Sequence, residues 1–279
     1  MKVDMHIHTT ASDGTWTPEI LVKNILSAGI QVFSVTDHDS FDNLSSVSHF
    51  ARKAGIFFIP GVEVSTSFCN ENYHILGYGI DTKSVELQEI VAENKASVEY
   101  GDMESIKYLI KKGYPVTLKG YQEYTHNPER GGFKALNYFI DKGLCKNIMG
   151  YLSLFEDIDY PFDVFYKNYV STELAINSII NSGGIPILAH PGGNIYKNDY
   201  KDIIELIFKK GIKGIECFHP ENNTETINYC IDFCNRNKLY ITGGSDCHGD
   251  LVKTRSLGKP ELLIDQIQIG QLYNRYLQF

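Results

Sequence analysis

Histidine and carboxylate side chains recur at the ends of apolar runs, and the first example is the segment VDMHIHTTASDG at residues 3–14. His6 and His8 are two residues apart, so on a β-strand both imidazoles would point to the same side. Two imidazoles with a nearby carboxylate, here Asp13, suit zinc, manganese or iron(II). One such pair is weak evidence, because a single strand histidine is more often a satisfied core or surface residue.

Ligand-type residues also end six later apolar runs. They are Asp37, His38 and Asp39 in VTDHDS, Glu63 in IPGVEVS, His74 in NYHILGYG, His190 in ILAHPGG, Glu216 and His219 in GIECFHPEN, and Asp246 and His248 in GSDCHG. Burying so many of these groups without an ion would cost several kcal/mol for each unpaired charge. The sequence therefore predicts a site for more than one metal ion.

Strand-like runs alternate with amphipathic helical stretches in residues 1–84 and 171–279. The first helical stretch has Pro18 at its start and Gly29 after its end, which are good boundary signals. Such alternation predicts a largely parallel sheet with crossover helices, closed into a barrel at this chain length. Strand ends of an α/β barrel converge on one face, which would bring the ligand-type residues together.

Residues 85–170 lack this alternation and read as a helical insertion that could lie over the site. The segment is rich in aromatic residues, namely Tyr114, Tyr121, Tyr124, Phe133, Tyr138, Phe139, Tyr151, Phe155, Tyr160, Phe162, Phe165, Tyr166 and Tyr169. A nucleobase could stack on one of these rings. The commoner explanation is that they form the core of the insertion itself.

Composition limits the partners. The 279 residues carry a net charge of −8, which disfavours general binding to duplex nucleic acid. The six cysteines form no CxxC pair and are expected to be reduced. Without a secretory h-region or a run long enough to span a bilayer, the sequence predicts a cytoplasmic protein.

The segments DMHIHTTASDG, VTDHDS, IPGVEVS, HILGYG, LAHPGG and GSDCHG occur in the order found in the PHP (polymerase and histidinol phosphatase) family of metal-dependent phosphoesterases, which this chain resembles. The resemblance covers roughly residues 1–80 and 171–250. It is strongest to stand-alone bacterial phosphatases with an inserted helical domain, which act on nucleoside monophosphates, 3′,5′-bisphosphates or the 5′ ends of short oligonucleotides. A distorted (β/α)7 barrel and two or three divalent ions (Mn, Zn or Fe) are implied.

The resemblance also implies which residues hold each ion. The first ion would be held by His6, His8, Glu63 and Asp246, the second by Glu63, His74 and His190, and the third by Asp13, His38 and His248. Asp37 would orient a ligand without binding metal itself.

The sequence departs from the family pattern in the insertion. Many relatives carry a Gly-Arg-Pro-His-like motif there, whereas the corresponding stretch here is NPERGGFKALNYFIDKG, which contains no histidine. Arg130 and Lys134 are its available cations and could bind substrate or be solvated surface charges. His219 could contact phosphate, protonate the leaving group or be a structural loop residue, and we take Arg130 and His219 as candidate catalytic groups.

We expect hydrolysis of a phosphomonoester by metal-activated hydroxide, with a nucleotide or a short 5′-phosphorylated oligonucleotide as substrate. One alternative is a phosphatase for a small amino-alcohol phosphate of the histidinol-phosphate type. An alternative of another class is a metal-stabilised scaffold without catalysis. The sequence does not determine the oligomeric state.

Overall fold

The computed structural model describes residues 1–276 except 128–129, 159, 161–166 and 194–195. Three members of the expected aromatic group, Phe162, Phe165 and Tyr166, lie outside the described residues.

One curved sheet runs through the molecule, with eight strands in the order β7-β6-β5-β4-β3-β2-β1-β8. The strands are β1 (Lys2–Asp4), β2 (Ile30–Val35), β3 (Phe57–Phe68), β4 (Glu71–Tyr78), β5 (Ile185–Leu188), β6 (Gly214–Phe218), β7 (Tyr240–Gly243) and β8 (Leu262–Leu263). The first seven follow one another in chain order, as expected for a distorted (β/α)7 barrel, and β8 adds a short antiparallel edge beside β1.

The sheet differs from an all-parallel barrel at β4, which pairs antiparallel with both β3 and β5. No helix connects β3 to β4. The two-residue turn at Cys69 and Asn70 has φ angles of 49° and 60°, and two consecutive positive φ values match the right-handed twist of a hairpin.

Backbone contacts beyond β1 and β7 nearly close the barrel. The His8 amide donates to the Cys247 carbonyl at 2.9 Å, and the Asp246 amide donates to the His6 carbonyl at 2.8 Å. Ile7 and Cys247 form a parallel bridge. This seam places the segments after the first and last parallel strands side by side.

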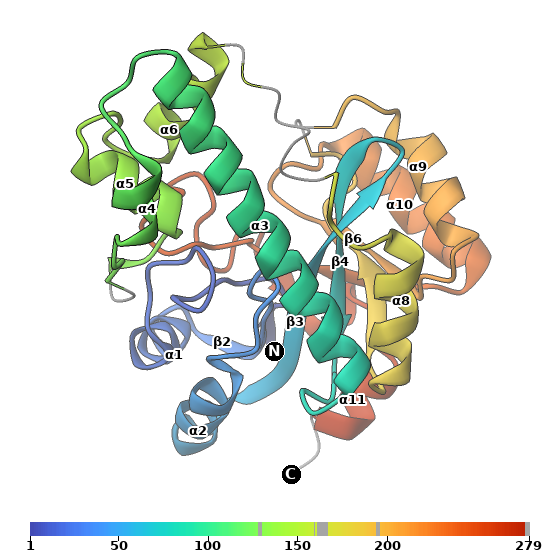
Figure 1. Ribbon diagram of the computed structural model, residues 1–279. Coiled ribbons are helices and arrows are strands. Elements are labelled where there is room, and N and C mark those ends of the chain that lie inside the picture. The colour runs from blue at the N-terminus through green and yellow to red at the C-terminus, as the bar shows by residue number, and fades with distance from the viewer. Residues whose placement is uncertain (128–129, 159, 161–166, 194–195, 277–279) are drawn as a thin grey trace.

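Helices cover the outside of the sheet, as Figure 1 shows. They are α1 (Pro18–Ser27), α2 (Leu44–Ala54), α8 (Thr172–Asn181), α9 (Tyr200–Phe208), α10 (Thr224–Asn237), the 3-10 turn η2 (Ile264–Gln266) and α11 (Gln271–Tyr276). The buried faces of α1 and α2, including Leu21, Ile25 and Val47, pack on the sheet in the largest apolar core. None of the helices in the described part of the chain is long and apolar enough to cross a membrane.

The long helix α3 (Val85–Lys111) belongs to two apolar cores. Its first half contributes Leu87 and Ile90 to the main core, whereas Ile106 and Leu109 join a separate core. That second core, here called the insertion core, contains Ile106, Leu109, Val116, Tyr121, Ala135, Leu136, Tyr138, Phe139, Cys145, Tyr151, Leu154, Phe155, Ile158 and Tyr160.

Three short helices lie beside the upper part of α3 in Figure 1, namely α4 (Leu118–Gln122), α5 (Lys134–Asp141) and α6 (Ile148–Asp157). Most of the described aromatic rings of this segment are buried in the insertion core or packed against it. Their burial favours the interpretation that these rings stabilise the segment itself.

Candidate metal centre

His6 and His8 lie just beyond β1, since the strand ends at Asp4. The bridge between Ile7 and Cys247 keeps this segment alongside the end of β7. Ile7 is fully buried in the main core, and the imidazoles on either side of it approach each other, with their Nε2 atoms 3.1 Å apart. The alternation expected for a strand therefore holds for these two histidines although they lie outside β1.

Glu63 lies in the middle of β3, which corrects the expectation that it ends a strand. The last β3 residue paired with β2 is Pro60, and β3 then continues to Phe68 as a hairpin with β4. His74 lies in the middle of β4 opposite Ser65, two residues along β3 from Glu63, through an antiparallel pairing that the sequence pattern did not indicate. The other candidate ligands follow β2, β5 and β7 as expected, namely His38, His190, Asp246 and His248.

The first group consists of His6, His8, Glu63 and Asp246, whose ligand atoms all lie within 4.8 Å of one another. His6 Nε2 is 3.1 Å from Glu63 Oε2, and His8 Nε2 is 2.9 Å from Asp246 Oδ1. All four residues are buried. Two imidazole nitrogens and two carboxylate oxygens thus converge on one point.

The other oxygen of Glu63 faces a second group. Glu63 Oε1 is 2.8 Å from His74 Nδ1 and 3.0 Å from His190 Nε2. His38 Nδ1 also approaches Glu63, at 3.3 Å from Oε2. The two oxygens of one buried carboxylate are therefore shared between two sets of imidazoles.

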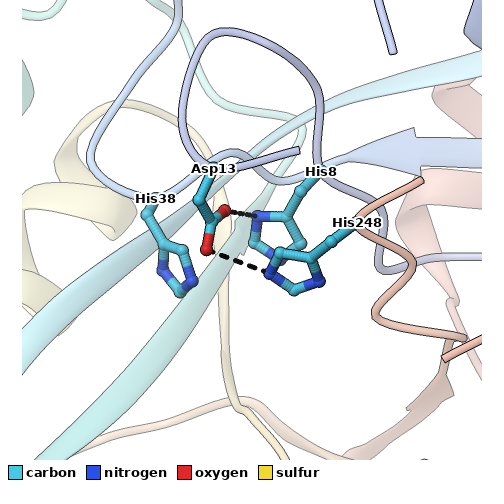
Figure 2. A group of neighbouring side chains, drawn as sticks. All are labelled: His8, Asp13, His38 and His248. Carbon is cyan, nitrogen blue, oxygen red and sulfur yellow. Dashed lines mark ion pairs between the residues drawn. The ribbon is translucent and has the colours of Figure 1, made fainter. Parts of the chain in front are cut away.

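The third group is drawn in Figure 2 and consists of His8, Asp13, His38 and His248. Asp13 Oδ2 is 3.2 Å from His248 Nε2, and Asp13 Oδ1 is 3.6 Å from His8 Nδ1. The His8 ring lies between those of His248 and His38, with ring centres 4.1 Å and 4.5 Å away, and the three rings border the Asp13 carboxylate in Figure 2. His8 thus lies between two groups, whereas the resemblance implies a role in the first alone.

Hydrogen bonds determine which imidazole nitrogen carries a lone pair. His6 Nδ1 donates to Glu216 Oε1 at 2.9 Å, and His248 Nδ1 donates to the carbonyl of Asp246 at 2.7 Å, because neither oxygen can donate. One proton per neutral ring leaves Nε2 of both histidines free to bind an ion.

His8 is oriented through Asp37, as the sequence suggests, but indirectly. Ser12 Oγ donates to Asp37 Oδ1 at 2.6 Å and lies 3.4 Å from His8 Nδ1, so it can accept the proton of that nitrogen. Asp37 also accepts from the amide and the hydroxyl of Thr9, which fixes the loop after His8. His8 Nε2 is then the atom left facing the first group.

The donor set fits divalent cations. Asp246 Oδ1, His38 Nδ1 and His74 Nδ1 are buried and have no hydrogen-bond partner among the described residues, although each lies near another ligand-type atom. Buried polar atoms without partners are costly, and a cation between them would satisfy them together. Imidazole and carboxylate ligands of this kind suit zinc, manganese and iron.

The electrostatic field of the site favours positive charge. Burial disfavours a charged imidazole, but the carboxylates of Glu216, Glu63 and Asp246 raise the pKa of His6 well above its usual value. Burial also acts against a charged His8, but the hydrogen bonds and charges of Asp246 and Glu63 outweigh it and raise the pKa of His8 to about 10. Divalent ions would experience this same attraction, so metal binding and imidazole protonation should compete.

His219 has the opposite tautomer from His6 and His248. The amide of Glu221 donates to His219 Nδ1 at 3.1 Å, so the ring proton lies on Nε2, which is 3.2 Å from Asp246 Oδ2. A nitrogen that carries a proton cannot bind a metal. This arrangement favours His219 as a donor of a hydrogen bond rather than as a metal ligand.

Arg255 is a site residue that the sequence analysis missed. It follows β7 in a loop, and its guanidinium contacts Asp246 Oδ2 through Nη1 and Glu221 Oε1 through Nη2. Its side chain is 24% exposed, so it lies at the rim of the buried cluster. No motif or spacing distinguished Arg255 from the nearby Lys253 in the sequence.

Arg130 and Lys134 have partners within residues 85–170. Arg130 Nη1 is 2.7 Å from Asp141 Oδ1 on the surface, and Lys134 Nζ lies 4.5 Å from the centre of the Tyr121 ring. The structure therefore does not bring either cation into contact with the described ligand cluster, and their role in substrate binding stays a prediction.

The backbone next to Arg130 does reach the site. The amide of Gly132 donates to the carbonyl of Asp13 at 3.2 Å. Leu251, from the loop after β7, packs against the insertion core. Residues 85–170 thus contact two loops that carry candidate ligands.

Comparison with known families gives a match to the PHP domain over residues 4–217. The curated relatives that match most of the chain include the following three. A phosphoribosyl 1,2-cyclic phosphate 1,2-diphosphodiesterase of Eggerthella lenta is 25% identical, covering 92% of this chain and 98% of its own. A 3′,5′-nucleoside bisphosphate phosphatase of Chromobacterium violaceum is 27% identical, covering 93% and 92%. The 5′-3′ exoribonuclease Rnm of Escherichia coli is 26% identical, covering 88% and 84%.

Two solved structures are similar over nearly their whole length. One, from Bifidobacterium adolescentis, is described as a candidate metal-dependent phosphoesterase and has a TM-score of 0.77 at 21% identity, covering 99% of this chain and 95% of that one. The other, from Chromobacterium violaceum, is described as an amidohydrolase with bound sulfate and no metal, and has a TM-score of 0.76 at 25% identity, covering 100% and 98%. Both likenesses agree with the barrel fold.

Proposed function

Because this chain belongs to the PHP domain family, whose model matches residues 4–217, we propose that it hydrolyses the phosphomonoester of a nucleotide or of a short 5′-phosphorylated oligonucleotide. It is a phosphoesterase, a hydrolase acting on phosphoric ester bonds. The observation that carries the proposal is the buried Glu63 carboxylate, which presents Oε2 to His6 and Oε1 to His190. A carboxylate shared in this way supports a site with at least two ions.

Nine residues would hold two or three divalent ions, namely His6, His8, Asp13, His38, Glu63, His74, His190, Asp246 and His248. Manganese, zinc and iron(II) all suit this donor set. Ions bound there would neutralise phosphoryl oxygens and provide a nucleophile at neutral pH. Burial lowers the pKa of His38 to about 3, which keeps its ring neutral and able to act as a ligand.

The protein's own groups would orient the reaction. Glu216 holds both the His6 ring, through Oε1, and the His190 amide, which donates to Oε2 at 3.0 Å. His219 directs its Nε2 proton toward Asp246 Oδ2. We infer that His219 contacts the phosphate or protonates the leaving group by shifting its Nε2 hydrogen bond from Asp246 Oδ2 to the substrate, since that proton faces the cluster.

Residues 85–170 form, in this proposal, an insertion that borders the substrate site, between barrel segments 1–84 and 171–279. The contact of Gly132 with the Asp13 carbonyl and the packing of Leu251 against the insertion core support this division. Arg130 and Lys134 would reach substrate only after leaving Asp141 and the Tyr121 ring.

The curated relatives support nucleotides or RNA ends as substrates, since two of those described are a nucleoside bisphosphate phosphatase and an exoribonuclease. A second candidate is a cyclic phosphodiester. It is favoured by the Eggerthella lenta diphosphodiesterase, which matches over 98% of its own length. The same cluster of metal ligands could serve hydrolysis of a phosphomonoester or of a cyclic phosphodiester. Only a comparison of substrates therefore distinguishes the two candidates.

Phosphate release by metal-stripped protein, with Mn(II), Zn(II) or Fe(II) added back, tests the proposal. The substrates are AMP, a 3′,5′-bisphosphate, a 5′-phosphorylated RNA, a 1,2-cyclic phosphate of a phosphoribosyl compound and histidinol phosphate. We expect metal-dependent turnover of at least one of the first three with the highest kcat/KM. Preference for the cyclic ester or for histidinol phosphate would replace the proposed substrate, and turnover of none with metal bound would indicate a scaffold.

A histidine pair provides the matched control. His8→Ala removes a buried ligand, and we expect kcat/KM to fall about 100-fold or more. His49→Ala changes an exposed histidine on α2 and should leave kcat/KM unchanged. Full activity in His8→Ala would overturn the metal assignment.

A further inference from the structure

We propose that Arg255 is a positioning residue that holds Asp246 with one oxygen turned toward the ion. The inference rests on the proposed function, because it takes Asp246 as a metal ligand. Arg255 comes from the loop after β7 and lies outside the set of nine candidate ligands. Its guanidinium contacts Asp246 Oδ2 and Glu221 Oε1 at the same time.

The two oxygens of Asp246 have different surroundings. Oδ1 has no hydrogen-bond partner among the described residues and lies 2.9 Å from His8 Nε2 and 3.3 Å from His6 Nε2. Oδ2 lies 3.2 Å from His219 Nε2 and also meets the Arg255 guanidinium. Both donors therefore act on the oxygen that faces away from the imidazole pair, and they leave Oδ1 for a cation.

These contacts form a closed ring of four residues. The Glu221 amide donates to His219 Nδ1, His219 Nε2 donates to Asp246 Oδ2, and Arg255 joins Asp246 back to the Glu221 carboxylate. The ring links the loop after β6 to the loop after β7. Because an arginine presents several donors in a rigid plane, it can hold two carboxylates in a fixed relation.

The backbone conformation and burial of Asp246 explain why its carboxylate needs the contact with Arg255. Asp246 has a φ of 51°, in the left-handed region, which is strained for residues with a Cβ although aspartate tolerates it better than most. Its side chain is 3% exposed and carries a charge that burial disfavours. Without Arg255, the carboxylate could rotate and share its oxygens differently between His219 and the imidazole pair.

Metal affinity of the metal-stripped protein tests the inference, measured with Mn(II) and Zn(II) by competition with a chelator. The variants are Arg255→Gln, Arg255→Lys and Glu221→Gln, with Lys253→Gln as control for loss of a positive charge from the same loop. Lys253 is exposed, with no described ion pair. We expect Arg255→Gln to weaken binding of the ion at Asp246 about 10- to 100-fold. Lys253→Gln should bind as the wild type does.

Two further results separate positioning from simple loop anchoring. Arg255→Lys keeps the positive charge but loses the planar guanidinium that contacts two carboxylates at once. Its metal affinity should therefore lie between that of Arg255→Gln and that of the wild type. Adding Glu221→Gln to Arg255→Gln should lower affinity no further, because both substitutions break the same ring.

The contrary outcomes are distinguishable. If Arg255→Gln lowers the Tm of the metal-free protein but leaves the metal Kd unchanged, Arg255 anchors a loop and the inference is overturned. If Arg255→Gln does not fold, the Kd of Arg255→Lys and Glu221→Gln decides, and unchanged values there also overturn it. A wild-type protein that binds no ion would overturn the proposed function and this inference together.

Discussion

The chemistry of the centre depends on which atom of each side chain is free. Glu216 and the Asp246 carbonyl accept hydrogen bonds from the Nδ1–H groups of His6 and His248, which leaves the Nε2 lone pairs for an ion. His219 receives a hydrogen bond at Nδ1 and therefore keeps its proton on Nε2. Neighbouring histidines can thus serve either as candidate metal ligands or as hydrogen-bond donors, because the hydrogen-bond partners of their rings differ.

Asp102 offers a test at the residue scale outside the metal centre. It lies on α3, is 5% exposed, and accepts a hydrogen bond from the Tyr121 hydroxyl at 2.5 Å. Burial raises its pKa to about 7, although Tyr121 and Lys134 act in the opposite direction. Between about pH 4 and this value the folded protein binds more protons than the unfolded chain, so stability falls as pH rises through that window.

We expect Asp102→Asn to remove this contribution. Between about pH 5 and 8, the wild type should lose on the order of 2 kcal/mol more unfolding free energy than the variant. Urea unfolding at each pH measures the difference. Tyr121→Phe deletes the hydroxyl that favours the carboxylate, so it should steepen the loss. Equal slopes for the wild type and Asp102→Asn would show that Asp102 is ionised throughout this range.

The residue types in the sequence predicted the candidate metal ligands better than they predicted the residues that hold those ligands in place. Ligand-type side chains after successive apolar runs are conspicuous, and the structure brings those of β1, β3, β4, β5 and β7 together. Arg255 has no such signal, since an arginine in a loop is usually a surface charge. Its role depends on where Glu221 lies after folding, and the two are 34 positions apart in the sequence.

At the scale of elements, the centre is built from strand ends and one hairpin. Alternating helices and strands predicted the barrel, because that pattern is local. The hairpin of β3 and β4 was not predicted, since its turn at Cys69 and Asn70 lacks the glycine typical of such turns. As a consequence, Glu63 was placed at a strand end, whereas the antiparallel pairing places it mid-strand opposite Leu76, with its side chain in contact with His74.

Gly131 tests how residues 85–170 contact the loop that carries Asp13. It has a φ of 70°, and an added Cβ would lie 2.4 Å from Thr15 Cα and 2.6 Å from the Gly14 carbonyl oxygen. Gly131→Ala should therefore push this turn away from the loop that carries Asp13. A displacement near 1 Å at a catalytic loop can cost about 100-fold, and we expect kcat/KM to fall about 10-fold or more.

Gly143→Ala is the matched control for Gly131→Ala. Gly143 has a φ of 72°, and an added Cβ would have no neighbour within 4 Å. Both substitutions should cost roughly 1 kcal/mol of stability from the positive φ. Only Gly131→Ala should lower kcat/KM, and an equal effect of the two on activity would refute a functional contact at Gly131.

At the scale of the molecule, the centre concentrates negative charge within an already acidic chain of net charge −8. Glu63, Glu216 and Asp246 are buried together, and nearby histidines hold the pKa of each below its usual value although burial acts against ionisation. Carboxylates that are ionised and buried repel one another unless a cation lies between them. The metal-free fold is therefore expected to be less stable than the loaded one.

Metal binding should accordingly stabilise the whole fold. An ion that binds only the folded state adds about 2.7 kcal/mol at 100 times its Kd, which should raise Tm by several degrees. A thermal melt of metal-stripped protein against increasing Mn(II) or Zn(II) measures this, and Tm should keep rising with the logarithm of metal concentration. His8→Ala should reduce the rise and His49→Ala should retain it, because only His8 faces the cluster. A Tm independent of metal in the wild type would show that the buried carboxylates are stabilised by protein groups alone.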